Sequence, residues 1–225
     1  DPRIVPGART LDELSYSEAT ELAYFGAKVI HPKTMYPAAE RGIPIWIKNS
    51  FAPEAAGTRI GPVISGNGSA KAIASISNLA AVTVEGRGQI DVSRVTTRIF
   101  SAVGRTGANV YMISQASSQH SVSFVVGAAD AEGVACALRD EFHDDLDRQR
   151  VLSVQVDPEV AIVAVVGAGM RGTPGVAGKV FSTMGEAGIN VIAIAQGSSE
   201  LNISFVVEER DVSAAVLALH SVFIA

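Results

Sequence analysis

The sequence predicts an α+β fold in which two small β-α-β-β-α-β domains follow a partial α/β segment. The second half of the chain repeats itself at an offset of 81 residues, and both copies show the same order of strand-like and helix-like hydrophobic patterns. The second copy lacks a fourth strand of its own, and a spare strand precedes the first copy. We therefore expect the first domain, residues 79–157, to be inserted into the second, which comprises 71–78 and 158–225, after a segment at 1–66.

The composition is that of a folded chain with a large core. Hydrophobic residues make up 48% of the 225 positions and charged residues 18%, which argues against global disorder. The net charge of −5 disfavours nucleic acid and anionic membranes as main partners, and no apolar run approaches the roughly 18–20 residues that span a bilayer. The single cysteine, Cys136, excludes an intrachain disulfide framework and a cysteine-cluster metal site. A cytoplasmic compartment fits these features, and because the chain begins at Asp1 rather than Met, we expect a fragment.

The first segment has an irregular pattern that is rich in proline. Its expected elements are a helix from Ser15 or Ser17 to Phe25, a helix from Pro32 to Gly42, and a strand over Ile43–Ile47. Glu18 and Glu21 lie near the positive end of the first helix, where carboxylates are favoured. The glycine-rich stretch Gly57–Gly68 is expected to be a linker and a domain boundary.

The duplication that follows has no gap. Between residues 82–138 and 163–219, 22 of 57 positions are identical. The identical pairs include Gly107 with Gly188, Asn109 with Asn190, Gln115 with Gln196, and Phe124 with Phe205. A period of this length is typical of two small domains rather than of a solenoid.

Each copy is expected to be ferredoxin-like, with a strand, a glycine-rich loop, a helix, two strands and a second helix. The expected strands are Ala80–Glu85, Asn109–Gln115 and Ser121–Val126 in the first copy, and Ala161–Val166, Asn190–Gln196 and Asn202–Val207 in the second. The first helices carry apolar residues at helical spacing: Val95, Ile99, Ala102 and Val103, and Val176, Val180, Thr183 and Met184. Asp130 and Asp211 begin the second helices. Val151–Val156 is the fourth strand of the first copy, and Ala72–Ser77 is the spare strand that we assign to the second.

A dinucleotide-binding interpretation of the second loop is disfavoured. Gly167-Ala-Gly169-Met-Arg-Gly172 satisfies the G-x-G-x-x-G pattern between a strand and a helix. However, the next strand ends at Gln196 instead of an acidic ribose ligand, and a short turn joins it to the following strand as a hairpin. The first copy also has Asp91 in place of the third glycine.

The two loops remain suited to a small anion such as an amino-acid carboxylate. Backbone N–H groups around residues 89–94 and 170–175 are the expected donors. The neighbouring polar residues are Asn109 and Gln115 in the first copy and Asn190 and Gln196 in the second. Turn chemistry for the asparagines and an ordinary polar strand end for the glutamines remain open, as does helix capping for Asp91. His31, His120, His143 and His220 show no ligand spacing, so no metal site is expected.

These residues lie in motifs that resemble the paired ACT domains of aspartate kinases. The motifs are Ile113-Ser-Gln115-Ala-Ser-Ser, Ile194-Ala-Gln196-Gly-Ser-Ser-Glu200 and Val166-Gly-Ala-Gly-Met-Arg-Gly172. The resemblance is closest to the threonine-sensitive branch. In the first segment, Asp1-Pro-Arg3 and Phe25-Gly-Ala-Lys28-Val29-Ile-His-Pro32 resemble the end of the amino-acid-kinase catalytic domain.

The resemblance implies ATP-dependent phosphorylation of L-aspartate to 4-phospho-L-aspartate by the intact enzyme, with ATP and Mg. Asp1, Arg3, Lys28 and Val29 would lie around the nucleotide, where cations offset phosphate charge. The catalytic residues of the family lie upstream of Asp1, so the fragment is expected to be inactive and to need no cofactor.

The resemblance also implies a feedback amino acid, threonine, at the ACT interfaces of a homodimer. Gln115 and Gln196 would contact it, with Asn109 and Asn190 nearby. Asp91 departs from the glycine of threonine-sensitive relatives, and its carboxylate would favour the ammonium group of lysine instead. Two alternatives stay open: the middle of a bifunctional aspartokinase–homoserine dehydrogenase, and a free-standing amino-acid-binding ACT module.

Overall fold

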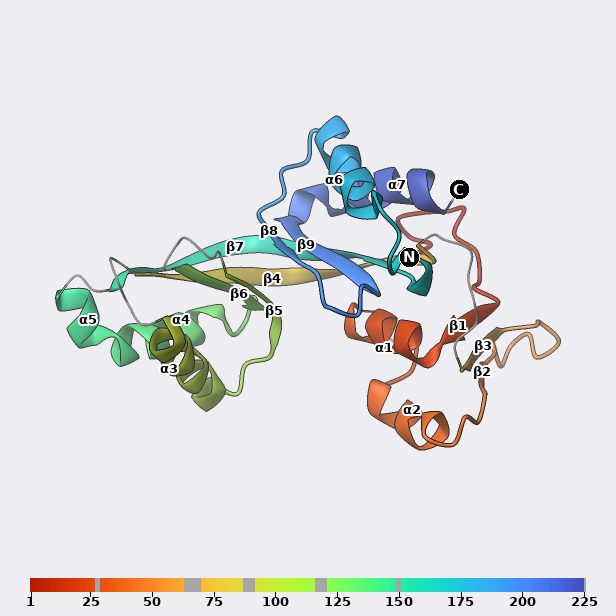
Figure 1. Cartoon of the computed structure of the whole chain (residues 1–225), viewed down its shortest axis with the longest axis horizontal. Coiled ribbons are helices and arrows are strands. Elements are labelled where there is room, and N and C mark those ends of the chain that lie inside the picture. Colours follow the sequence, from red (N-terminus) through yellow and green to blue (C-terminus); the bar gives the residue numbers. More distant parts are fainter. Residues whose placement is uncertain (27–28, 63–69, 87–91, 116–120, 149–150, 225) are drawn as a thin grey trace. The chain divides into compact units, whose positions relative to one another are not determined.

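A computed structural model describes residues 1–26, 29–62, 70–86, 92–115, 121–148 and 151–224. The chain divides into two compact units (Figure 1). The outer unit comprises Asp1–Ile76 and Ile162–Ala225, and the inserted unit comprises Ser77–Ala161. The chain therefore leaves the outer unit once and returns to it, as the sequence predicts. The exact domain boundaries stay a prediction.

The inserted unit has the predicted order of elements. After the long strand β4 (Ala72–Gly86) come α3 (Val92–Thr106), β5 (Val110–Gln115), β6 (Ser121–Gly127), α4 (Ala131–Glu141), the short α5 (His143–Asp147) and β7 (Val151–Val166). The strand order in this unit is β5-β6-β4-β7, and α3 and α4 cover one face of the strands (Figure 1). Asp130 directly precedes α4, as expected.

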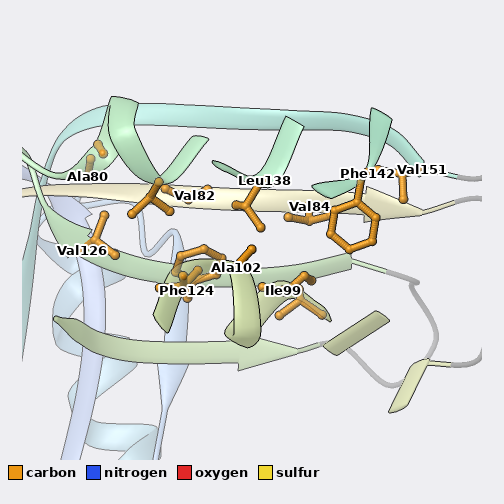
Figure 2. Packing of buried hydrophobic residues seen from close by; sticks show 14 residues of the cluster. Ala80, Val82, Val84, Ile99, Ala102, Phe124, Val126, Leu138, Phe142 and Val151 are labelled. Atoms are coloured by element: carbon orange, nitrogen blue, oxygen red, sulfur yellow. The ribbon is translucent and has the colours of Figure 1, made fainter. Parts of the chain in front are cut away.

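The core of the inserted unit lies between that face and the two helices (Figure 2). Ile99 and Ala102 of α3 are fully buried, as their helical spacing predicts. They pack in one cluster with Phe124 of β6 and with Leu138 and Phe142 at the other helix. Full burial of such side chains contributes about 1.5–3 kcal/mol each, so this packing is what holds α3 on the sheet.

The outer unit contains the second copy of the repeat. Its elements are η1 (Ala168–Met170), α6 (Val176–Glu186), β8 (Ala193–Ala195), β9 (Asn202–Glu208), η2 (Glu209–Asp211) and α7 (Val212–Phe223). The strand order in this unit is β4-β7-β9-β8, and α6 and α7 lie on one face of β7 and β9 (Figure 1). Thr183 and Met184 of α6 are buried, as predicted.

The spare strand lies where the sequence predicts it. The first residues of β4 belong to the outer unit and neighbour β7 in the sheet order. The backbone N–H of Lys71, one residue before β4, donates to the carbonyl of Val166 at the end of β7, with an N···O distance of 2.8 Å. β7 thus gains a partner that the second copy does not itself supply.

The two copies repeat the same contacts. Phe100 and Phe124 have ring centroids 5.8 Å apart, and so do Phe181 and Phe205, which lie 81 positions later. Ile113 stands opposite Phe124 in the first copy, and Ile194 stands opposite Phe205 in the second. The duplication therefore preserves register as well as sequence.

The first segment forms a second, three-stranded sheet within the outer unit. Its strands are β1 (Glu13–Ser15), β2 (Ile45–Ile47) and β3 (Thr58–Gly61), in the order β1-β3-β2, and its helices are α1 (Tyr16–Tyr24) and α2 (Pro32–Ala39). β3 pairs in parallel with β1 and antiparallel with β2. Ser15 is the N-cap of α1, with Glu18 completing a capping box.

Several predicted boundaries are wrong. The stretch Gly57–Gly68 is not all linker, because Thr58–Gly61 is the central strand β3. The second helix ends at Ala39 instead of continuing to Gly42. The strands predicted separately at Ala72–Ser77 and Ala80–Glu85 are one strand, and the same holds for the two parts of β7. The second strand of the second copy is shorter than predicted, because β8 ends before Gln196.

Each long strand contains one left-handed residue at an equivalent position. Asn78 in β4 has φ +62° and Glu159 in β7 has φ +58°, and the two lie 81 positions apart. Asparagine tolerates this conformation, whereas glutamate adopts it at a cost of roughly 1–2 kcal/mol. Glu159 is exposed, so its strained backbone gains nothing from side-chain burial.

We predict that Glu159→Gly stabilises the chain by about 0.5–1 kcal/mol, because glycine removes the strain at φ +58°. Asp157→Gly is the matched control: it removes the same charge from another exposed position of β7, but Asp157 does not have a positive φ. The control should destabilise by about 0.5–1 kcal/mol. Urea unfolding at pH 7 measures both, and equal destabilisation by the two variants would contradict the strain at Glu159.

Candidate functional site

Gln115 is the last residue of β5. It lies at the end of the sheet where the loop after β4 begins. β4 and β5 are both antiparallel to β6, so they run parallel to each other. Gln115 stands opposite Val122, and Glu85 stands opposite the neighbouring Ser121. The last residues of β4 and β5 therefore lie at the same end of the sheet. Gln115 is exposed, so its amide is accessible at this end of the sheet. Asp91, the other predicted residue of this loop, lies outside the described residues.

The structure does not bring Asn109 and Gln115 of one chain together. Asn109 precedes the first residue of β5, and Val110 stands opposite Val126 at the far end of β6. Six residues of extended strand span about 20 Å. The two predicted residues therefore lie at opposite ends of β5, and one small ligand reaches only one of them on a given chain.

The second copy shows the same separation. Gln196 directly follows β8, and it is exposed, as is Asn190 before that strand. Ala195 stands opposite Ser204, whose Oγ donates to the Ala195 carbonyl at 3.0 Å. This bond fixes the backbone directly before Gln196. Gln196 thus lies at the end of the sheet where β9 begins, and Asn190 lies toward the other end of the strands.

The glycine-rich loop of the second copy uses its own N–H groups internally. The N–H groups of residues 170, 171 and 173 donate to backbone carbonyls: Met170 to Gly167, Arg171 to Ala168, and Thr173 to Met170. Gly172 N–H donates to the Glu200 carboxylate at 2.7 Å. The prediction that these groups receive a ligand carboxylate is therefore wrong for residues 170–173, because a short 3₁₀ turn and a neighbouring carboxylate already satisfy them.

A further donor of the loop meets a carboxylate from the first segment. Ala168 N–H donates to Glu18 Oε1 at 2.8 Å. The other oxygen, Oε2, accepts from Ser15 N–H at 2.8 Å, Ser15 Oγ at 3.0 Å and Lys71 Nζ at 3.0 Å. The Glu18 side chain is only 1% exposed. An acidic side chain thus lies where the sequence pattern suggested a ligand anion.

The environment of Glu18 favours its charged form. Burial by itself would raise the pKa of the Glu18 carboxyl. The hydrogen bonds from Ala168 and Ser15 and the ion pair with Lys71 outweigh that effect, so the pKa lies below its ordinary value of 4.5. Glu18 is therefore ionised at neutral pH although it is buried.

A second carboxylate of α1 reaches the same end of the sheet, where β7 stops and β9 begins. Glu21 lies one helical turn after Glu18, so both are on one face of α1. The side-chain amide of Asn202, the first residue of β9, donates to Glu21 Oε2 at 2.5 Å. Sequence reasoning placed both glutamates near the start of a helix but gave them no further partner, since Ala168 and Asn202 are 150 and 181 residues away.

The predicted nucleotide residues are dispersed over the first segment. Arg3 and Asp1 form an exposed ion pair, with Nη2 2.7 Å from Oδ2. Val29 is 66% exposed and lines an apolar cavity of about 220 Å³. Asp1 instead lines a cavity of about 330 Å³ between Phe25 and the start of β4. The prediction for Lys28 lies outside the described residues.

Neither metal ligands nor membrane spans are found in the described part of the chain. Within it, no group of three or more His, Cys, Asp or Glu side chains is arranged to hold a metal ion. None of its helices is long and apolar enough to cross a membrane.

Comparisons with known proteins match both parts of the chain. The ACT domain family matches residues 82–142 and 163–223, and the amino acid kinase family matches residues 1–49. A bifunctional aspartokinase/homoserine dehydrogenase 1 from Arabidopsis thaliana, named as chloroplastic, is 44% identical over 99% of this chain and 25% of its own length. The chain thus spans about a quarter of that relative.

Two solved structures resemble the whole chain. The aspartate kinase of Clostridium acetobutylicum is 31% identical with a TM-score of 0.86, over 99% of this chain and 51% of its own. Aspartokinase III of E. coli, in complex with lysine and aspartate, is 28% identical with a TM-score of 0.80, over 100% of this chain and 49% of its own.

We predict that Glu18→Gln destabilises the chain by about 2 kcal/mol at pH 7, because the mostly buried Lys71 loses its counter-charge. Glu13→Gln is the matched control, because Glu13 is 42% exposed in its pair with Arg59 and should cost at most about 1 kcal/mol. Since the pKa of folded Glu18 is lowered, its stabilisation is present above pH 4.5 and is lost as the pH falls through the folded pKa. Urea unfolding between pH 7 and pH 3 should show the gap between wild type and Glu18→Gln closing, and a gap independent of pH would contradict the assignment.

Proposed function

The chain belongs to the ACT domain family, and from this premise we propose that it is the regulatory region of an aspartate kinase, joined to the last part of the catalytic domain. The observation that carries the proposal is the presence of two ACT copies and an amino-acid-kinase segment in one chain. A free-standing ACT module would not include that segment.

The proposed parent reaction transfers a phosphoryl group from ATP to L-aspartate. Such chemistry rests on positioning and on cations that offset phosphate charge. From this chain, the exposed Arg3 guanidinium is suited to a phosphate, although Asp1 already pairs with it, and Val29 offers an apolar surface. The described residues offer no cluster for Mg. Under this proposal the metal ligands and the catalytic residues come from the rest of the kinase domain.

We propose Gln115 and Gln196 as contacts of a feedback amino acid. Both are exposed, and they occupy equivalent strand ends in two copies that share register. A primary amide donates and accepts at once, which suits the hydroxyl and ammonium groups of threonine. Asn109 and Asn190 lie at the other ends of the same strands, so they contact the same ligand only if a second chain supplies them.

The identity of the effector depends on Asp91. A carboxylate at this position favours a second ammonium group, as in lysine, and the E. coli relative is named in complex with lysine. The duplicated glutamines favour threonine, which we propose as the effector, and lysine is the alternative that the titrations below separate from it.

A second candidate is the regulatory part of a bifunctional enzyme. The Arabidopsis relative, which is 44% identical, is named as an aspartokinase/homoserine dehydrogenase. Reading the parent gene beyond the codon for Ala225 decides between the two, because only the bifunctional enzyme continues into a dehydrogenase domain.

We also propose that the ACT copies form a homodimer. Among the described strands, β5 and β8 stand last in the sheet order. Each carries an exposed apolar residue at the equivalent position: Ile113 is 49% exposed and Ile194 is 47% exposed. Exposed apolar side chains on the last strands of a sheet favour association with another chain.

For the effector, Gln115→Ala and Gln196→Ala should each weaken inhibition of the parent kinase by threonine fivefold or more, on the order of the 1 kcal/mol that a hydrogen bond contributes. Uninhibited turnover should change little, because the chemistry lies in another domain. The matched control is Gln155→Ala, the same substitution at an exposed position of β7, which should leave inhibition unchanged.

Inhibition curves with threonine and with lysine test this assignment. Wild-type threonine sensitivity in both glutamine variants would show that the glutamines do not contact the effector. Inhibition of the unsubstituted kinase by lysine alone would overturn threonine as the effector and make Asp91 the candidate specificity residue.

For the dimer, light scattering at micromolar concentration should give about twice the 23.4 kDa of one chain. Ile113→Lys should lower the mass toward that of the monomer, because a charge then faces the interface. Lys33→Ile, an exposed site in the first segment, should leave the dimer intact. A mass near one chain for the wild type, with and without amino acid, would rule the dimer out.

A further inference from the structure

The contact between α1 and the second ACT copy differs from the other ion pairs found among the described residues. Its carboxylate is 1% exposed, whereas the other ion-paired carboxylates of the described residues are between 18% and 80% exposed. Glu18 receives donors from three places in the sequence: its own cap Ser15, Lys71 before β4, and Ala168 after β7. One side chain thus joins the first segment to both strands of the β4–β7 pair, at the end where β4 begins and β7 stops.

The burial of this ion pair favours two discrete arrangements over intermediate ones. A buried carboxylate must keep its donors, since an uncompensated buried charge is strongly unfavourable. Partial withdrawal of α1 would leave Glu18 desolvated and Lys71 without its counter-charge, so intermediate positions are disfavoured. The helix is therefore either docked, with all donors in place, or released into water. Bistable elements of this kind carry coupling between sites.

The docked helix contacts the sheet at the end that carries a predicted effector residue. Asn202, the partner of Glu21, is the first residue of β9. Two residues later, Ser204 fixes the Ala195 backbone directly before Gln196. A ligand held by Gln196 therefore acts on the same end of β9 that binds α1.

We propose that Glu18 is a positioning residue that couples the amino-acid-kinase segment to the end of the second ACT copy that carries Gln196. This inference rests on the proposed function and adds the route of regulation. Effector bound at Gln196 has different affinity for the docked and released states of α1, and only that difference shifts the kinase segment. Glu18 itself touches neither effector nor substrate.

The first experiment compares Glu18→Gln with Glu13→Gln in the intact parent kinase. Both remove one charge from the first segment, but the Glu13 carboxylate forms its ion pair with Arg59 of the same segment. We expect Glu18→Gln to raise the half-inhibitory effector concentration fivefold or more, or to leave a residual activity plateau. We expect Glu13→Gln to stay within twofold of wild type. A merely structural role would lower thermal stability and leave the inhibition curve in place.

The second experiment measures binding and docking separately in the 225-residue chain. Titration calorimetry with threonine and lysine should show binding by wild type and by Glu18→Gln. Amide hydrogen exchange of Tyr16–Tyr24 should change on effector addition in the wild type and not in Glu18→Gln. If Glu18→Gln fails to fold, Asn202→Ala is the substitute variant, because it removes the Glu21 contact and leaves the buried carboxylate paired.

The outcomes separate this inference from the proposed function. Effector binding in the wild type with α1 exchange unchanged, or inhibition retained in Glu18→Gln, would overturn the coupling and leave the proposed function standing. No binding of either amino acid would overturn the effector role and the coupling together. Binding with loss of inhibition in Glu18→Gln alone, and not in Glu13→Gln, would establish Glu18 as the coupling residue.

Discussion

Pairing of β4 with β7 is the interaction on which both units depend. Backbone N–H and C=O groups that are buried without partners are costly, and β7 has β9 on only one side. The start of β4 supplies the other side, and the bond from Lys71 to Val166 closes that pairing at its end. Because β4 then continues into the inserted unit, the chain must build that unit before it returns along β7. The insertion is thus the consequence of satisfying one strand: the inserted unit is a contiguous piece of chain, and the outer unit is not.

The same end of β7 explains the fate of the glycine-rich loop. A loop that follows a strand and turns tightly presents N–H groups in the direction of an anion, and the sequence pattern indicates this correctly. The anions are the chain's own carboxylates, Glu18 and Glu200. A side chain already fixed by a capping box pays less entropy on binding than a free amino acid does. The loop therefore joins segments of the chain, and the exposed polar chemistry lies at Gln196 instead.

The sequence predicts features that depend on neighbouring residues, and it does not predict features that depend on contacts between residues far apart in the chain. The duplication, the order of elements and the buried face of α3 depend on local pattern and repetition, and they are correct. β1 and β3 were missed because each has only three or four residues, and β3 gains its stability from partners as distant as Glu13. Glu18 was placed at a helix start without its distant partners, since no local pattern encodes a contact 150 residues away. Asn109 and Gln115 were grouped because they flank one strand, but a strand separates its ends by its whole length.

Identical register in the two copies means that they begin with the same binding chemistry at Gln115 and Gln196. Apart from the loop difference between Asp91 and Gly172, a difference in their response comes from what packs against each copy. α1 packs against the second through Glu18 and Glu21. Coupling between sites is reciprocal in free energy. Under the proposed coupling, whatever docking of α1 does to effector affinity at Gln196, the effector does equally to docking. Anything that holds α1 in place, including substrates bound to the kinase segment, therefore changes effector affinity at the second copy more than at the first.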